Sequence, residues 1–247
     1  MSNIPKSEAL RNRYEEKYLL FLPVWSMESS LHKQLKQLYA DSGAEVEHKL
    51  GRYRIDVVCD GELIEIQHGS LAAIRDKVAD LTTDHRVLVV KPIVVRKRLV
   101  KLKSQGGCVV ARRLSPKRGS ILDLFDELVY FTRVYPHPNL TLEVPLVDIE
   151  EWRYPGHGRR RYRRMNDHVV DDQKLIKLHE IHRFQTRRDL LKLIPTDLPD
   201  PFHTGHLAET MNIPRDKAQQ IAYCLRKTAS LEDCGKLVNA RLYRRAA

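Results

Sequence analysis

The sequence predicts an α/β protein, with a mixed sheet flanked by helices and a small C-terminal domain after it. Two alternating apolar runs surround Asp60-Gly61, which predicts an antiparallel hairpin. Apolar residues at helical spacing over 71–81, followed by a short apolar run at 86–91, predict a right-handed crossover to a parallel strand. From residue 186 onward, short helical segments precede a basic ribbon, so a separate helical unit is expected there.

The hairpin can be placed residue by residue. A loop at Asp60-Gly61 pairs Cys59 with Glu62, and counting back sets Asp56 against Glu65 at a position without ladder hydrogen bonds. Their Cβ atoms are then about 4.5–5.5 Å apart. Gln67 is expected on the same face. The opposite face is expected to be buried, and it carries Tyr53, Ile55, Val57, Ile64 and Ile66.

The elements around the hairpin follow from periodicity. An amphipathic helix over 27–38 ends near Gly43, and 45–50 forms a first strand. Ser70 is a candidate N-cap for the helix over 71–81. The run 86–91 is typical of a strand buried on both faces. The expected order is helix, three strands in a meander, helix, strand.

The middle of the chain completes the first domain, which we expect to span 1–135. Residues 94–103 are expected to begin as strand and continue as helix, 108–113 to form a strand, and 121–132 a mostly buried helix. The breaker 135–139 precedes an alternating strand at 140–147. A connecting region over 136–185 then contains an Arg- and Tyr-rich segment at 153–164. This segment is either a mobile solvated loop or a segment that contacts the phosphates along a nucleic-acid backbone, and the two interpretations are compatible.

Directly opposed acids destabilise a strand pair unless a positive charge compensates them. Asp56 and Glu65 could hold a hard divalent cation, or they could lie on a solvated face where Arg54 or nearby basic side chains neutralise them.

The order of elements, with Ile55-Asp56 on the second strand and Glu65-Ile-Gln67 on the third, resembles the core of the PD-(D/E)XK nuclease superfamily, the restriction-endonuclease-like fold. The resemblance covers about the first half of the chain. It implies that Asp56 and Glu65 bind Mg²⁺ (or Mn²⁺), and that Gln67 takes the third motif place, where most members have Lys. Gln carries no charge and cannot act as a base, although some members use it.

The resemblance also suggests two further site residues. Lys77, on the border of the apolar stripe of its helix, could supply the missing cation, or it could simply be solvated. Glu28 matches an acid that some members add to the metal site. Alternatively, it is a helix N-terminal Glu that the macrodipole favours.

The last segment, 186–247, resembles a winged helix-turn-helix domain. Helices are expected over 186–194, from Thr204, and over 215–227 after Pro214, and then a ribbon whose turn is Cys234-Gly-Lys. The resemblance implies that the third helix enters the major groove, although a winged helix can also serve protein contacts or dimerisation. The candidate nucleic-acid contacts are Arg159, Arg160, Arg161, Arg163, Arg164, Arg215, Gln219, Gln220, Arg226, Lys227, Lys236, Arg241 and Arg244.

Composition favours a polyanionic partner. The 247 residues carry a formal charge of +11, and phosphate neutralisation provides most non-specific affinity for nucleic acids. No run could span a membrane and no apolar signal segment is visible, so a cytoplasmic protein with no membrane partner is expected. The four cysteines lack C-x-x-C spacing; a zinc site of His203, His206, Cys224 and Cys234 fits no common pattern.

Two hypotheses follow. One is a Mg²⁺-dependent nuclease with a DNA-binding accessory domain, for which a homodimer is plausible. The other is a non-catalytic DNA-binding or regulatory protein with a degenerate nuclease core. RNA is a less favoured partner than DNA.

Overall fold

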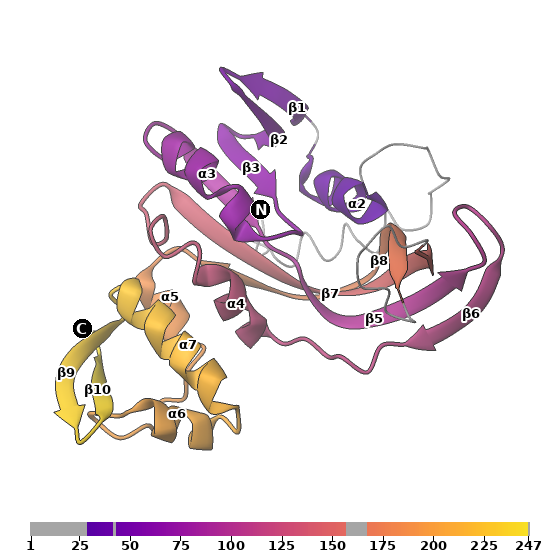
Figure 1. The fold of residues 1–247 in the computed structure, drawn as a ribbon. Helices are drawn as coiled ribbons and strands as arrows, with labels where there is room; N and C mark the ends of the chain where they lie inside the picture. The colour runs from indigo at the N-terminus through magenta and orange to yellow at the C-terminus, as the bar shows by residue number, and fades with distance from the viewer. Residues whose placement is uncertain (1–28, 42, 157–166, 247) are drawn as a thin grey trace, which may run out of the picture.

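The computed structural model describes residues 29–41, 43–156 and 167–246. Within them, the chain forms a mixed α/β structure with one eight-stranded sheet, followed by a small unit of helices and a β-hairpin (Figure 1). The expectation of a mixed sheet flanked by helices is confirmed at this level.

Both antiparallel and parallel neighbours occur in the sheet. The meander is antiparallel and comprises β1 (Glu45–Leu50), β2 (Tyr53–Cys59) and β3 (Glu62–Ile66). β3 then pairs in parallel with β4 (Arg86–Val90), as the crossover predicted. The long β7 (Leu140–Pro155) pairs in parallel with β4 and then with β5 (Ile93–Leu102), while its other edge pairs with β8 (His168–Phe184). β6 (Val109–Leu114) adds an antiparallel edge to β5.

Two features of the sheet differ from the sequence expectations. The helix expected in the second half of 94–103 is wrong, because β5 runs unbroken and has partners along both edges. In that second half Leu99, Val100 and Leu102 are all buried, and a register shift against β6 between Lys101 and Leu102 interrupts the two-residue period of a regular strand. In addition, residues 140–184 form the central β7 and its partner β8, so the boundary expected at residue 135 separates strands of one sheet.

Helices cover both faces of the sheet. In β4, Val87 and Val89 belong to one apolar cluster and Leu88 and Val90 to another, so this strand is buried on both sides as expected. The second cluster lies under α2 (Ser30–Tyr39), whose first turn is capped by Ser29. The first cluster lies under η1 (Leu71–Ala73), α3 (Arg75–Leu81), η2 (Ile121–Asp123) and α4 (Leu124–Leu128).

The C-terminal unit packs against α4 through its longest helix. It consists of α5 (Arg187–Leu191), α6 (Thr204–Thr210), α7 (Arg215–Lys227), β9 (Leu231–Leu237) and β10 (Ala240–Arg245). Its buried residues join the cluster under α4, and the Cys224 thiol donates to the Phe125 carbonyl at 3.7 Å. Figure 1 shows α7 (orange) beside α4.

The turn of the C-terminal ribbon differs from the expectation. Leu237 pairs with Ala240, so Val238 and Asn239 form the loop instead of Cys234-Gly-Lys. Gly235, at φ +100°, lies where the register shifts opposite Arg241 and Tyr243. Gly235 therefore lies in a β-bulge within the ribbon, where, as in many turns, a positive φ favours glycine.

The start of α5 gives a testable pH dependence. The Asp189 carboxylate accepts from the amides of Gln185 (3.0 Å) and Thr186 (2.9 Å). Burial raises its pKa, but Lys192 and these amides outweigh burial and hold the pKa of Asp189 well below the usual value. A carboxyl with a depressed folded-state pKa stabilises the fold above its unfolded pKa and loses that contribution as the pH falls.

Asp189→Ala should therefore lower the free energy of unfolding by about 1 kcal/mol at neutral pH. The difference from wild type should shrink as the pH falls below about 4. Urea denaturation across this range measures it, with Asp171→Ala, at an exposed position on β8, as control. A loss independent of pH would contradict the assignment.

Candidate active site and nucleic-acid interface

The hairpin has the expected register near its loop. Cys59 pairs with Glu62, Val58 with Leu63 and Val57 with Ile64. The ladder ends there, so the expected direct pairing of Asp56 with Glu65 is wrong. Instead, Asp56 Oδ2 accepts from the Ile66 amide at 2.9 Å, and the Glu65 carboxylate accepts from the Asp56 amide. The two acids thus join the strands through side chain to main chain hydrogen bonds at the point where the ladder stops.

The backbone of β2 changes face at the same point. Ile55 belongs to the cluster under α3 and α4, whereas Val57 belongs to the cluster under α2. A regular strand would place both on one face, so the single buried face expected from 53 to 57 is wrong. On β1, Glu47 adopts φ +60° between the residues paired with Ile55 and Val57. The irregularity therefore affects both strands beside Asp56.

Asp56 is held from the α2 side. His32 Nε2 lies 3.2 Å and Lys36 Nζ 3.2 Å from Asp56 Oδ1. Burial raises the pKa of Asp56, but the hydrogen bonds from His32 and the Ile66 amide, with the charge of Lys36, outweigh it and lower the pKa. Asp56 is therefore kept as a carboxylate.

Glu65 is held from the α3 side. Lys77 Nζ lies 2.5 Å from Glu65 Oε1 and donates to the Arg54 carbonyl at 2.5 Å. The Glu65 residue is only 5% exposed, and burial raises its pKa; Lys77 opposes this rise, while the charge of Asp56 adds to it. Glu65 Oε1 is buried and, among the described residues, has no hydrogen bond of regular geometry beyond this ion pair. Lys77 thus lies against the predicted acid, and the charges of the two acids interact.

Of the other two predicted site residues, only Gln67 is among the described residues. The Gln67 side chain donates to the Ser70 carbonyl at 2.8 Å, which directs it along the loop after β3. Glu28 lies outside the described residues.

Sequence reasoning missed Lys91, which follows β4. It is 4% exposed; its ammonium lies 3.3 Å from Glu127 Oε1 and donates to the Gly69 carbonyl. Burial lowers its pKa, and Glu127 opposes the shift. The signal in the sequence that could have identified Lys91 is its position directly after the apolar run of a buried strand.

The donor set of Asp56 and Glu65 fits Mg²⁺ better than it fits zinc. No group of three or more His, Cys, Asp or Glu side chains that could hold a metal occurs in the part of the chain that is described. Mg²⁺ takes one or two carboxylates and completes its shell with water, whereas a zinc site needs three or four protein ligands. Glu65 Oε1, which among the described residues has Lys77 as its ion-pair partner, is a suitable donor. A divalent cation bound between the two carboxylates would neutralise the negative charge that Lys36 and Lys77 now balance.

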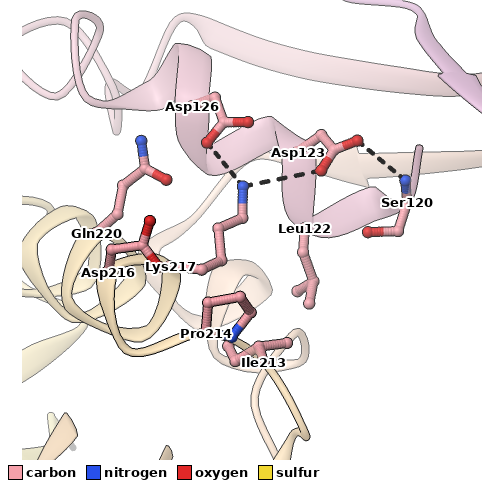
Figure 2. A pocket seen from close by; sticks show the side chains of 9 residues that line it. All are labelled: Ser120, Leu122, Asp123, Asp126, Ile213, Pro214, Asp216, Lys217 and Gln220. Atoms are coloured by element: carbon pink, nitrogen blue, oxygen red, sulfur yellow. Dashed lines mark hydrogen bonds and ion pairs between the residues drawn. The ribbon is translucent and has the colours of Figure 1, made fainter. Parts of the chain in front are cut away.

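On α7, one side faces α4 and the other is exposed. Figure 2 shows Lys217 directed at Asp126 and Asp123, at 2.7 Å and 3.8 Å, beside a pocket of about 630 Å³ that Gln220 also lines. The exposed residues Arg215, Gln219, Tyr223 and Lys227 recur every four positions and form a single stripe, the α7 stripe. Of the predicted base readers, Gln219 lies on this stripe and Gln220 lies toward α4.

The remaining predicted nucleic-acid contacts fall into three groups. In the ribbon, Arg241 pairs with Asp233 at 2.5 Å and Arg244 with Asp200 at 2.8 Å, while Lys236 is exposed. Arg226 is half-buried in the last turn of α7. The third group lies outside the described residues: Arg159, Arg160, Arg161, Arg163 and Arg164.

The four residues considered for zinc do not come together. His203 and His206 stack at the start of α6, with ring centroids 3.7 Å apart. Cys224 is buried under α4, where burial raises the pKa of its thiol to about 12, and Cys234 is exposed on β9.

Comparison with known proteins assigns no activity. A family model described as a domain of unknown function (DUF8091) matches residues 29–185. An uncharacterized protein of Treponema pallidum (strain Nichols) is 28% identical over 185 residues, which is 74% of this chain and 72% of that protein. No solved structure matches. No helix of the described chain has the length and apolar character needed to cross a membrane.

Proposed function

This chain belongs to the family of the domain of unknown function DUF8091, and we propose its function from its own residues. We propose that it is a Mg²⁺-dependent hydrolase of DNA phosphodiesters, whose C-terminal unit is a DNA-binding winged helix. The observation that carries the proposal is the meeting of Asp56 and Glu65 where the β2–β3 ladder stops, with Lys77 against Glu65. The order of helix, antiparallel meander, helix and parallel strand supports a restriction-endonuclease-like core.

The arrangement suits phosphodiester hydrolysis. Asp56 and Glu65 would hold the cation, which when bound supplies charge to the phosphate and lowers the pKa of water. His32 and the Ile66 amide fix the Asp56 carboxylate, so its position does not depend on the metal. Lys77 brings a positive charge to the site from α3, the charge that Gln67 lacks. A lysine from the next helix would then stabilise the developing negative charge on the phosphate.

The C-terminal unit supports DNA as the substrate. The α7 stripe presents two cations, an amide and a phenol on one exposed helix face. An amide side chain can read an adenine edge in the major groove, and the cations can contact phosphates. The ion pair of Lys217 with Asp126 holds the other side of α7 to the sheet unit, which leaves the stripe for the partner.

A second function has its own supporting observation. Both acids already have basic partners within the protein: Asp56 is paired with Lys36 and His32, and Glu65 is paired with Lys77. Such a site is electrostatically complete without metal. It would suit a DNA-binding regulator that has lost cleavage.

Cleavage and metal binding measured together separate the two functions. The full chain is incubated with supercoiled plasmid, single-stranded oligonucleotide and RNA, in Mg²⁺, in Mn²⁺ and in EDTA, while its unfolding temperature is recorded in the same buffers. The nuclease predicts metal-dependent cleavage of DNA and a higher unfolding temperature with metal. Tight DNA binding with neither effect would identify the regulator, and a preference for RNA would change the substrate class.

A further inference from the structure

We propose that β5, β6, β7 and β8, where they lie side by side, form a second, metal-independent binding site for the phosphate groups of a polynucleotide. Lys101, Arg113, Arg153 and His168, one from each strand, line a pocket of about 450 Å³ together with Tyr154, Pro155 and Asp167. We name the first four residues the cradle. The proposal extends the proposed function by adding a substrate contact that is separate from Asp56 and Glu65.

Sheet register explains how residues distant in sequence meet there. Lys101 pairs with Arg153 across the parallel β5–β7 ladder, and Arg113 pairs with Leu99, two residues before Lys101 on the same face. His168 pairs with Pro155 at the end of the β7–β8 ladder, which the bond from the Gly156 amide to the Asp167 carbonyl extends. Four neighbouring strands thus contribute one basic residue each to one pocket.

The charge of the cradle is poorly balanced. Like charges directly across a strand pair are destabilising, yet Lys101 lies opposite Arg153. Within the described residues, Lys101 and Arg113 have no carboxylate within ion-pair distance, and Asp167 is the one acid lining the pocket. Arg153 Nη1 lies 3.3 Å from His168 Nε2, so these two side chains also meet.

The preceding residues of the same strands show the opposite arrangement. Lys97 Nζ lies 2.6 Å from Glu151 and Arg98 Nη1 lies 3.4 Å from Glu150. These two basic residues of β5 therefore have their charge balanced by an acid on β7. Lys101 and Arg113 of the cradle have no such acidic partner among the described residues, so they are suited to bind an anion from outside the protein.

Two further features favour a polymer over a free phosphate. A second basic pocket, of about 140 Å³, lies further back along β5, beside the C-terminal end of β6, and is lined in part by Arg96, Lys97 and Arg118. Successive basic pockets along one pair of strands suit successive phosphates of a backbone. Tyr154 in the cradle pocket also offers a ring against which a sugar or base can pack.

The test measures binding without cleavage. Fluorescence anisotropy of labelled single-stranded and duplex DNA is followed in EDTA at several salt concentrations, for wild type, Lys101→Gln, Arg113→Gln and the double variant. Lys49→Gln is the matched control, because Lys49 is an exposed strand lysine on β1, far from the cradle in the strand order, and gives the same charge change. Pyrophosphate is added as a competitor.

Each cradle substitution should weaken binding several-fold, and the double variant roughly tenfold at low salt. The slope of log K against log salt should fall by about one for each phosphate that the variant no longer neutralises. Lys49→Gln should bind as wild type. Equal losses for Lys49→Gln and Lys101→Gln, no binding by wild type, or pyrophosphate binding with unchanged DNA affinity would each overturn the cradle.

These outcomes are separable from failure of the proposed function. If the protein binds DNA through Lys101 but never cleaves it, the cradle holds and the nuclease proposal fails. If Lys101→Gln and Arg113→Gln bind and cleave as wild type, the nuclease proposal holds and the cradle fails.

Discussion

Asp56→Asn should lower the rate of metal-dependent DNA cleavage by about a thousandfold, because a cation held by two carboxylates contributes several kcal/mol to transition-state stabilisation and each 1.4 kcal/mol is a factor of ten. The substitution keeps the size of the side chain and an oxygen that can accept from the Ile66 amide. It removes the charge that attracts both the cation and Lys36. Single-turnover cleavage in Mg²⁺ measures the effect.

The control for this variant is Asp171→Asn, at an exposed position on β8, which should cleave as wild type. DNA binding in EDTA should be unchanged in Asp56→Asn, because the site acts on the bound phosphate whereas the α7 stripe and the cradle provide the affinity. Wild-type cleavage by Asp56→Asn would remove Asp56 from the site, and equal residual cleavage in all variants would point to a contaminating nuclease.

Lys77→Met should destabilise the metal-free protein by about 2–4 kcal/mol, since removing one partner of a buried ion pair leaves the other charge uncompensated. Glu65 is the partner left behind, with a side chain 6% exposed against 19% for Lys77. The double variant Lys77→Met/Glu65→Gln should recover most of the loss, because it leaves no charge behind. Urea denaturation in EDTA gives the three free energies of unfolding.

Metal should change this result in a specific way. If Glu65 binds a divalent cation, Mg²⁺ replaces the missing positive charge, so it should stabilise Lys77→Met more than it stabilises wild type. Mg²⁺ should not stabilise the double variant. Equal responses of the three proteins to Mg²⁺ would argue against a metal at Glu65, and an undestabilised Lys77→Met would show that this ion pair contributes little.

Local sequence patterns predicted the local geometry well. The Asp60-Gly61 loop gave the register of Val57, Val58 and Cys59 against β3, because a two-residue turn fixes which residues pair. Helix α7 begins and ends as expected, since Pro214 suits its start and its apolar stripe has helical spacing. The same patterns could not give β8, whose charged and irregular sequence depends on pairing with β7 for its conformation.

The sequence by itself determined that Asp56 and Glu65 lie on adjacent strands of one hairpin, because a turn and a two-residue period suffice for that. The tertiary structure decided that β2 changes face at Asp56, that His32 and Lys36 hold one acid and Lys77 the other, and that β7 lies at the centre of the sheet. These contacts join residues far apart in the chain, and their energies depend on burial, which a local pattern does not specify. The cradle has the same origin, since Lys101 meets Arg153 through parallel pairing alone.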